Sequence, residues 1–452
     1  MKRQFSLSEI SEWISADKKI FGAAQSVVTD SRKITPGSLF VALEGERFDG
    51  HAYLAEALQK GAVAAVAHKR GNFPAEKVLF VGDTGRAYRA IARLHRIKEA
   101  PRMVGITGSV GKTSTKDMIA AVLASELYTL KTEANLNNQF GVPQTLLGLD
   151  GHQAAVVEMA MTAIGEIEEL ALTVLPDVGV VTNIGVSHME RLGSRDNIFK
   201  AKMEILSGLR EGSPLILNGD SDYLCGYENP HYRVIRYGLS GQNCNLTAEE
   251  IEEEGAGTSF VVCCEGRRTP VRIPAVGRHN VLNALAAWAV GECLGISPEH
   301  RAEALAACLP SGMRQRMVSW RGSTVVEDCY NAGPESMEAA LTTLAGRPAM
   351  GKKYAALADM LELGELSLSA HRKVGRRAAE LGLDGVFTTG EMGRVISDAA
   401  REAGAENARH FDTKEDMAAF LTGLLAPGDI LWVKGSHGMA LETMLQTLYA
   451  RE

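Results

Sequence analysis

The sequence predicts an α/β protein made of three domains with parallel sheets. Apolar, strand-like runs alternate with helical patterns along the chain, which is the order that parallel sheets require. A chain of 452 residues is too long for one ordinary core. A loop of small residues, 107–113, lies between an apolar run and a helical pattern, as it does in folds that bind phosphate.

The three domains are expected at residues 1–82, 83–312 and 313–452. The first is a small α/β unit with strands at 38–43 and 62–67 and a helix at 53–60. The central domain has strands at 103–107, 154–159, 178–183 and 215–218, helices from 116 onward and at 144–149 and 280–294, and a hairpin of 258–264 with 269–273. The third alternates strands at 324–327, 354–358, 385–388 and 429–433 with helices near 336–344 and 371–381, a doubly wound, Rossmann-like pattern.

Composition argues against several classes of protein. The net charge is −7 without a basic block, so a large nucleic-acid interface is not expected. No apolar run is long enough to span a bilayer, and the first residues lack the apolar core of a signal peptide. The seven cysteines are scattered and form no C-x-x-C pair, which suits reduced thiols in the cytoplasm. Nothing points to an obligate oligomer, so we expect a cytoplasmic monomer.

The loop 107–113 has the residue types of a nucleotide triphosphate site. Backbone N–H groups and a helix N-terminus favour phosphate, Lys112 can reach the β- and γ-phosphates, and the Thr113 hydroxyl can ligate Mg²⁺. The common pattern G-x-x-x-x-G-K-[ST] requires glycine where this chain has Ile106, and Gly108 marks a shortened variant. The residues expected to bind ATP here are Thr107, Gly108, Ser109, Val110, Gly111, Lys112, Thr113 and Ser114.

Three further side chains are candidates for a metal site. Glu158 ends an apolar strand, where parallel sheets place ligand groups, and a carboxylate suits Mg²⁺; the alternative is a solvated strand end. His188 follows another strand end and is either a ligand or an ordinary loop residue. Lys202 lies in a helical stretch, and the pattern alone favours a solvated helix face for it.

The stretch Asn135-Leu-Asn-Asn-Gln-Phe-Gly-Val-Pro forms a polar loop ahead of a helix. Its amides, those of Asn137 and Asn138 included, can orient a phosphate or a peptide substrate. The alternative is turn chemistry alone, because Asn, Gly and Pro all favour turns. The residues leave both interpretations open.

Together these stretches resemble the Mur ligase family, the ATP-dependent amide-forming enzymes of peptidoglycan precursor synthesis. The resemblance covers essentially the whole chain. The most specific stretches are Asn135-Leu-Asn-Asn and Asp359-Met-Leu-Glu-Leu-Gly, and the shortened loop, Gly277-Arg-His-Asn-Val-Leu-Asn and Val433-Lys-Gly-Ser also match. The fold implied is a small UDP-binding domain, a central P-loop ATPase-like domain and a C-terminal Rossmann-like domain.

The resemblance also implies the ligands of two Mg²⁺ ions. Thr113 and Glu158 would hold the first ion between the β- and γ-phosphates, and His188 would hold the second. Lys202 matches the family's lysine that carries a carbamate made from CO₂, which replaces the solvated-face interpretation. A carbamate supplies anionic oxygen, which suits a hard cation.

The resemblance also implies which residues contact the nucleotide and the sugar substrate. Asn280 and Asn283 resemble the adenine and ribose contacts, and Asp328 the ribose-binding acid of the third domain. Arg314 resembles the arginine that reaches the γ-phosphate between domains, although Arg316 is an alternative. The first domain resembles a UDP-sugar-binding domain, and the residues expected to bind substrate are Ser31, Arg32, Gly45, Asn137 and Asn138.

The implied reaction is the ATP-dependent ligation of D-alanyl-D-alanine to UDP-N-acetylmuramoyl-tripeptide through an acyl phosphate. The alternative within the family is the ligase that adds the third amino acid to the UDP-muramoyl-dipeptide, but the Asp-Asn-Pro-Arg string of that enzyme does not occur here. A folylpolyglutamate-synthetase-like enzyme and a non-catalytic nucleotide-binding protein are further alternatives. The Asn-Leu-Asn-Asn stretch argues against the former, and the intact set of expected ligands against the latter.

Two positions depart from the family pattern. The usual Ser-Tyr-Asn-Ala-Asn-Pro reads Cys329-Tyr-Asn-Ala-Gly-Pro, so Gly333 lacks an amide side chain. The usual Lys-Gly-Ser-Arg ends in His437, which cannot reproduce a guanidinium fork.

Overall fold

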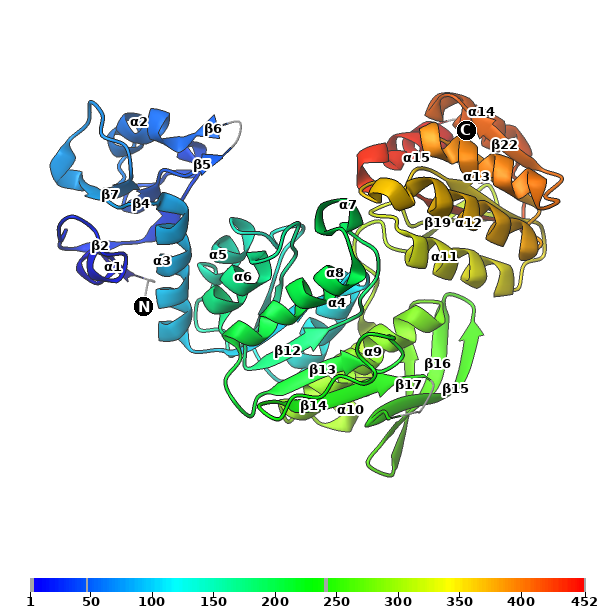
Figure 1. Cartoon of the computed structure of the whole chain (residues 1–452), viewed down its shortest axis with the longest axis horizontal. Helices are drawn as coiled ribbons and strands as arrows, with labels where there is room; N and C mark the ends of the chain where they lie inside the picture. Colours follow the sequence, from blue (N-terminus) through cyan, green and yellow to red (C-terminus); the bar gives the residue numbers. More distant parts are fainter. Residues whose placement is uncertain (1–3, 46–47, 240–242, 451–452) are drawn as a thin grey trace.

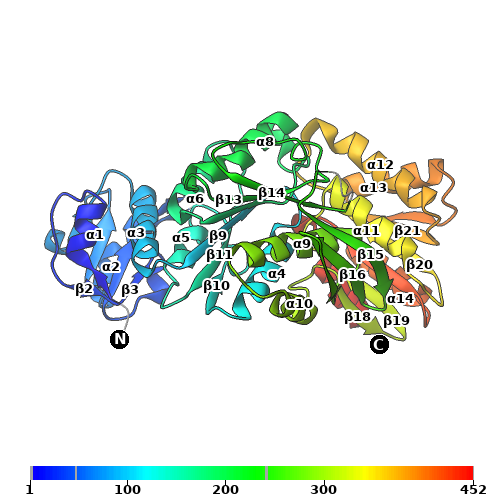
Figure 2. The ribbon, with the colours of Figure 1, turned by 90° about the horizontal axis from the view of Figure 1, so that it is seen from below.

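The computed structural model describes residues 4–45, 48–239 and 243–450, and it forms an elongated molecule. The N-terminal part lies at one end, the C-terminal part at the other, and the central part between them (Figures 1 and 2). Each part is built around its own parallel or mostly parallel sheet. The α/β fold class expected from the sequence is therefore confirmed. Among the described residues, no helix has the length and apolar character needed to cross a membrane.

The N-terminal sheet has the parallel order β3-β4-β7-β8. Its strands are β3 (Ser26–Val28), β4 (Ser38–Val41), β7 (Ala64–Ala67) and β8 (Val78–Phe80), and the helices are α1 (Leu7–Trp13) and α2 (Leu54–Gln59). Two short pairs add β1 (Phe5–Ser6) with β2 (Ala23–Ala24) and β5 (Glu44–Gly45) with β6 (Phe48–Asp49). The expected strands and helix are present, whereas β3 and β8 are too short to stand out in the sequence.

Helix α3 (Thr84–Glu99) joins the N-terminal and central parts. The Asp83 side chain caps it by accepting the N–H of Arg86 at 2.8 Å. Tyr88 and Ile91 of this helix share one core with residues of the N-terminal sheet and with residues of the central part. The domain boundary expected between residues 82 and 83 stays a prediction, because α3 packs against both the N-terminal and the central part.

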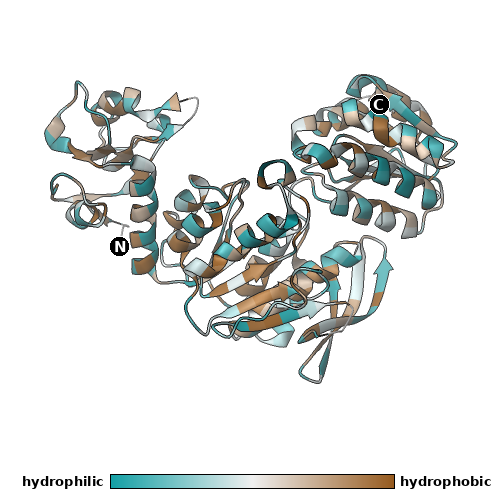
Figure 3. Ribbon diagram, viewed as in Figure 1, coloured by the Kyte–Doolittle hydropathy of each residue, from teal (hydrophilic) through white to brown (hydrophobic). Residues whose placement is uncertain are grey.

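The central sheet has the order β10-β11-β9-β12-β13-β14-β15-β16-β17. Its strands are β9 (Arg102–Thr107), β10 (Thr129–Lys131), β11 (Ala154–Glu158), β12 (Val178–Val181), β13 (Pro214–Asn218), β14 (Arg233–Gly238), β15 (Leu246–Glu254), β16 (Gly257–Cys264) and β17 (Arg267–Ile273). The pairs are parallel as far as β15, and the expected hairpin forms the antiparallel end. Strands β9, β11 and β12 consist mainly of buried apolar residues, as parallel strands covered by helices on both faces do. In the view of Figure 1, Figure 3 shows the strands around β12 and β13 in brown.

The helices around this sheet place the site residues. They are α4 (Lys112–Ala124), α5 (Gly141–Leu146), α6 (Glu166–Val174), α7 (Met189–Leu192), α8 (Arg195–Met203), α9 (Arg278–Cys293) and α10 (Pro298–Ala307). Helix α4 begins at Lys112, four residues before the start read from the apolar pattern, because its first turn faces the site and carries polar residues. Helix α5 lies three residues earlier than expected, since its first turn includes Gly141 and Pro143.

The C-terminal sheet has the order β18-β19-β23-β20-β21-β22, with only β18 antiparallel among these pairs. Its strands are β18 (Arg316–Trp320), β19 (Ser323–Glu327), β20 (Lys353–Leu357), β21 (Gly385–Thr389), β22 (Ala408–Phe411) and β23 (Ile430–Lys434). The helices are α11 (Pro334–Gly346), α12 (Ser367–Glu380), α13 (Glu391–Glu402), α14 (Lys414–Leu424) and α15 (Leu441–Tyr449). The doubly wound pattern expected for this part is confirmed.

Candidate active site

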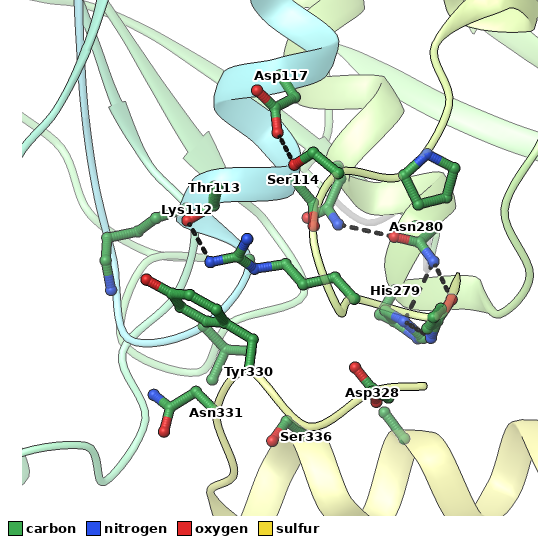
Figure 4. A pocket seen from close by; sticks show the side chains of 18 of the residues that line it. Lys112, Thr113, Ser114, Asp117, His279, Asn280, Asp328, Tyr330, Asn331 and Ser336 are labelled. Atoms are coloured by element: carbon green, nitrogen blue, oxygen red, sulfur yellow. Dashed lines mark hydrogen bonds between the residues drawn. The ribbon is translucent and has the colours of Figure 1, made fainter. Parts of the chain in front are cut away.

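A cavity of about 480 Å³ lies between the central and C-terminal parts. Its walls come from the loop before α4, the start of α9, the connection 308–315 and the segment that follows β19 (Figure 4). This is the carboxyl edge of the central sheet, where open parallel sheets bind ligands. Segments far apart in the sequence therefore meet at one polar cavity.

The loop between β9 and α4 is held in shape by the neighbouring strand end. Gly108 has a φ of +148°, and a Cβ there would lie 1.8 Å from Thr182 Oγ1, so only glycine fits. The N–H groups of Ser109 and Val110 donate to Asn183 Oδ1 at 3.1 and 2.9 Å. The shortened loop is thus a packed turn, which explains why glycine is needed at 108 rather than at Ile106.

Lys112 lies at the first turn of α4, beside this loop. Its Nζ donates to the carbonyl oxygens of Gly108 and Ser109 at 2.7 and 3.3 Å. Burial lowers the pKa of Lys112, with Glu158 opposing and Arg314 adding to that effect. The positive charge therefore sits where the phosphate-binding loop opens into the cavity. Thr107 lies behind the loop, buried at the end of β9.

Several expected residues meet around Glu158, which is buried at the end of β11. The Thr113 hydroxyl donates to Glu158 Oε2 and the Asn137 amide donates to Oε1, both at 2.8 Å. Arg314 Nη2 donates to the Thr113 hydroxyl at 3.2 Å. Arg316, in contrast, has Nε 2.7 Å from Glu327 Oε2 and does not line the cavity. Of the two arginines, the geometry favours Arg314.

The start of α9 carries a chain of buried amides. Asn280 Nδ2 donates to Gln315 Oε1 at 2.8 Å, and Asn283 Nδ2 donates to Asn280 Oδ1 at 3.1 Å. The Thr115 hydroxyl donates to Asn283 Oδ1 at 3.0 Å, so α4 and α9 are joined here. Burial lowers the pKa of His279 to about 4, so this cavity wall carries a neutral imidazole and uncharged amides at neutral pH.

Asp328 faces the same cavity from the end of β19. Its Oδ2 accepts from Lys434 Nζ at 2.8 Å and from Trp432 Nε1 at 3.2 Å, which fixes the carboxylate. Gln315 and Tyr330 are among the cavity residues that the sequence did not single out. The Arg314 guanidinium lies 3.6 Å from the centre of the Tyr330 ring, a cation–π contact. The sequence signal for Gln315 was its proximity to Arg314, and Tyr330 lies in the family stretch that begins at Cys329.

The two departures from the family pattern lie near this wall. His437 is exposed, and its ring stacks on Tyr330 with 5.6 Å between centroids. Gly333 precedes α11 with a φ of −152°, so glycine is not required there by backbone strain. A Cβ at Gly333 would meet nothing nearer than Glu335 Oε2, at 4.0 Å.

His188 and Lys202 lie on the other side of the phosphate loop. His188 lines the cavity, and its Nδ1 lies 2.8 Å from Glu362 Oε2, although without an aligned N–H···O bond. Lys202 on α8 is 2% exposed and does not line the cavity. Within the described ranges, its Nζ has no hydrogen bond or ion pair. The solvated helix face read from the pattern is wrong, because α8 packs this side against the sheet.

Burial changes the pKa of both groups. It lowers the pKa of Lys202 well below the usual value, and the charge of Lys112 lowers it further. It also lowers the pKa of His188, against the effect of Glu362. A buried amine with a lowered pKa and a nearby imidazole are the donor types that a carbamate and a metal site would use.

The remaining expected residues lie elsewhere. Ser31, Arg32 and Gly45 belong to the N-terminal part and do not line the cavity. Arg32 forms a fork on Asp30 at 2.9 and 2.8 Å, and this contact lowers the pKa of Asp30 to about 2. Glu46 and Arg47 of the same stretch lie outside the described residues.

Asn138 makes turn contacts rather than cavity contacts. Its Oδ1 accepts from the N–H groups of Phe140 and Gly141 at 3.1 and 2.9 Å. Asn137, one residue earlier, points its amide at Glu158. The polar loop before α5 therefore uses one asparagine for its own fold and another at the site.

Comparison with known proteins agrees with this geometry. Three family models match: the Mur ligase family, catalytic domain at residues 24–106, the Mur ligase middle domain at 106–291, and the Mur ligase, glutamate ligase domain at 313–437. The chain is 37% identical over 427 residues to UDP-N-acetylmuramoyl-tripeptide--D-alanyl-D-alanine ligase of Bacillus subtilis. The matched region covers 93% of this chain and 92% of that protein.

Two solved structures are similar over nearly the whole chain. A crystal structure of MurF from Acinetobacter baumannii has a TM-score of 0.91 at 30% identity and covers 99% of both chains. MurF ligase from Thermotoga maritima, in complex with ADP, has a TM-score of 0.87 at 27% identity and covers 94% of this chain and 97% of that one. On this full-length likeness, the chain belongs to the Mur ligase family.

Proposed function

We propose that the chain joins D-alanyl-D-alanine to UDP-N-acetylmuramoyl-tripeptide with ATP, giving the UDP-muramoyl-pentapeptide, ADP and phosphate. The observation that carries the proposal is the cavity in which the phosphate loop, Glu158 and Arg314 meet Asp328 of the C-terminal part. The full-length relative from Bacillus subtilis bears the name of this activity. The site therefore belongs to an ATP-dependent ligase of peptidoglycan precursor synthesis.

The reaction has two steps that share one reacting carboxyl group. The terminal carboxylate of the tripeptide attacks the γ-phosphorus of ATP, an O–P bond forms, and ADP leaves with the electron pair of the broken bond. The amine of D-alanyl-D-alanine then attacks the acyl carbon, phosphate leaves, and the nitrogen gives up a proton. Because two anions must approach in the first step, Lys112 and Arg314 are placed to offset their repulsion.

Two Mg²⁺ ions are part of the proposal. The hydroxyl of Thr113 and the carboxylate of Glu158 lie 2.8 Å apart and offer hard oxygen donors for one ion. His188 and a modified Lys202 would serve the other. When bound, such ions would offset the negative charge of the phosphate groups that the carboxylate approaches.

Carbamylation of Lys202 is supported by its surroundings. Burial favours the uncharged, nucleophilic form of an amine by lowering its pKa, and Lys202 has no partner among the described residues. Its nitrogen would attack the carbon of CO₂ and lose a proton, giving a carbamate anion. That change turns an unpaired buried amine into a pair of oxygen donors.

The N-terminal part is assigned to the UDP-sugar, with Ser31, Arg32 and Gly45 as contact residues. Domain limits of 1–82, 83–312 and 313–452 remain part of the proposal, as do a monomeric state and a cytoplasmic location. Free thiols at all seven cysteines, which lie within the described residues, are compatible with that location.

Coupled measurement of ADP formation tests the proposal. We expect turnover that requires both UDP-N-acetylmuramoyl-tripeptide and D-alanyl-D-alanine, with the pentapeptide as the product by mass spectrometry. Turnover of the UDP-muramoyl-dipeptide with a free amino acid at an equal rate would instead assign the chain to the preceding ligase. ADP formation without either substrate would contradict both.

A further inference from the structure

The loop after β20 is firmly anchored inside the C-terminal part. Asp359 Oδ1 accepts the N–H of Gly393 at 2.7 Å, at the start of α13. The next two N–H groups donate to side chains: that of Met360 to His371 Nε2 at 2.8 Å, and that of Leu361 to Ser436 Oγ at 2.9 Å. The loop therefore leaves the sheet edge in a fixed direction, toward the central part.

Glu362, the next residue of this loop, has a left-handed backbone. Its φ is +64°, which non-glycine residues rarely adopt. Gly364 follows with a φ of +52°, and a Cβ there would lie 3.1 Å from the Cα of Glu190 on α7. The absence of a side chain at 364 thus lets the loop approach α7 closely, and the unusual turn at 362 is maintained by that approach.

The turn at Glu362 directs its carboxylate to His188, across the boundary between the two parts. His188 is itself left-handed, with a φ of +65°, at the residue before α7. Glu362 Oε2 lies 2.8 Å from its Nδ1. The segment before His188 is also held by the C-terminal part, since the N–H of Val186 donates to Glu335 Oε1 at 3.1 Å. Two glutamates of one part therefore hold the strand end that carries the imidazole.

We infer that Glu362 is a positioning residue that orients the His188 ring for the second metal ion. With Nδ1 facing the carboxylate, Nε2 is the nitrogen left for a cation. A carboxylate behind a histidine ligand fixes the ring and strengthens the ligand, and its loss typically weakens metal binding about 10- to 100-fold. Because Glu362 and His188 lie on different parts, binding of this ion is tied to the approach of the C-terminal part. The inference rests on the proposed role of His188.

Direct metal binding tests this inference separately from catalysis. The full chain is titrated with Mn²⁺ in the presence of adenylyl imidodiphosphate, and bound Mn²⁺ is followed by electron paramagnetic resonance. For Glu362→Gln we expect the second Mn²⁺ to bind at least about tenfold more weakly, with the first Mn²⁺ and the nucleotide unchanged within about twofold. Glu365→Gln is the matched control, because Glu365 is an exposed glutamate of the same loop without a contact to His188.

Three results would decide the matter. Two Mn²⁺ ions bound by Glu362→Gln as tightly as by the unmodified chain would overturn the inference and leave the proposed ligase activity intact. Weakening by Glu365→Gln to the same extent would overturn it too, since loop charge alone would then explain the loss. A single Mn²⁺ bound by the unmodified chain would show that there is no second metal ion, and this would overturn the inference too. Substrate-dependent ADP formation by the same preparation tests the ligase activity separately.

Discussion

The two sides of the phosphate loop differ in how completely their polar groups are paired. On the nucleotide side, Thr113, Glu158, Asn280 and Asn283 form hydrogen bonds of 2.8 to 3.1 Å with protein partners. On the other side, Lys202 is buried without a hydrogen bond or ion pair among the described residues, and His188 meets Glu362 without an aligned bond. Buried polar groups are normally satisfied, so the second side is incomplete as a protein structure.

This difference teaches how the site is divided between protein and ligands. The side chains on the nucleotide side are already ordered by hydrogen bonds. ATP can therefore replace these bonds with its own at little cost in conformational entropy. In the proposed mechanism, CO₂ and a metal ion from outside the chain would complete the side of Lys202, together with the approach of the C-terminal part. Substitutions on the two sides should therefore fail in different ways, and the following experiments separate them.

Removing the amine of Lys202 should have the largest effect. For Lys202→Ala we expect kcat to fall about 10³-fold, because the anionic donor of the second side is lost. Acetate or formate at high concentration should restore part of the rate by filling the space with a carboxylate. Steady-state ADP release measures both effects, and Lys200→Ala, an exposed lysine two residues earlier on α8, is the control. Full activity in Lys202→Ala would remove the carbamate from the mechanism.

The two arginines of the connection should differ sharply. Arg314→Ala removes the cation that donates to Thr113, and we expect kcat to fall about 10²-fold with a smaller change in the KM for ATP. Arg316→Ala breaks only a contact with Glu327 outside the cavity and should stay within about twofold. Measuring kcat and KM for both variants decides between them. A larger loss of kcat in Arg316→Ala than in Arg314→Ala would instead indicate that the γ-phosphate lies near β18, outside the cavity.

At the amides of α9, losses should appear in nucleotide binding rather than in kcat. Asn280→Ala removes the amide that bonds Gln315, and we expect ATP affinity to fall about tenfold, or about 1.4 kcal/mol, by calorimetry. Arg278→Ala, exposed at the start of the same helix, should bind ATP normally. Unchanged ATP affinity in Asn280→Ala would contradict a contact between the adenine nucleotide and the start of α9. It would also weaken the contrast between the two sides.

Outside catalysis and nucleotide binding, His279 predicts how stability depends on pH. Its pKa is about 4 when folded and near 6.5 when unfolded, so the unfolded chain takes up the proton first. Stability is therefore lost as the pH falls from about 6.5 to about 4, by up to about 3 kcal/mol for this group. Replacing His279 by Asn should flatten that part of a plot of Tm against pH. A plot of unchanged slope would show that His279 titrates alike in both states.

Much of the nucleotide side could be predicted because its residues are close in sequence. Residues 107–114 form one contiguous loop and helix start, and Glu158 ends an apolar strand that can belong only to a buried sheet. Lys202 could not be placed in this way. Its helix carries polar residues on several faces, and only the packing of α8 against the sheet makes position 202 a buried one.

The sequence by itself determined the α/β class, the three-part order, the phosphate loop and most of the residues proposed to contact the nucleotide, because strand and helix periods and a contiguous loop are local properties. The tertiary structure decided which arginine faces Thr113, which asparagine of the polar loop reaches Glu158, and that Glu362 meets His188. Those contacts join residues up to 201 positions apart. No local pattern encodes such distances, since they depend on how the C-terminal part packs on the central one.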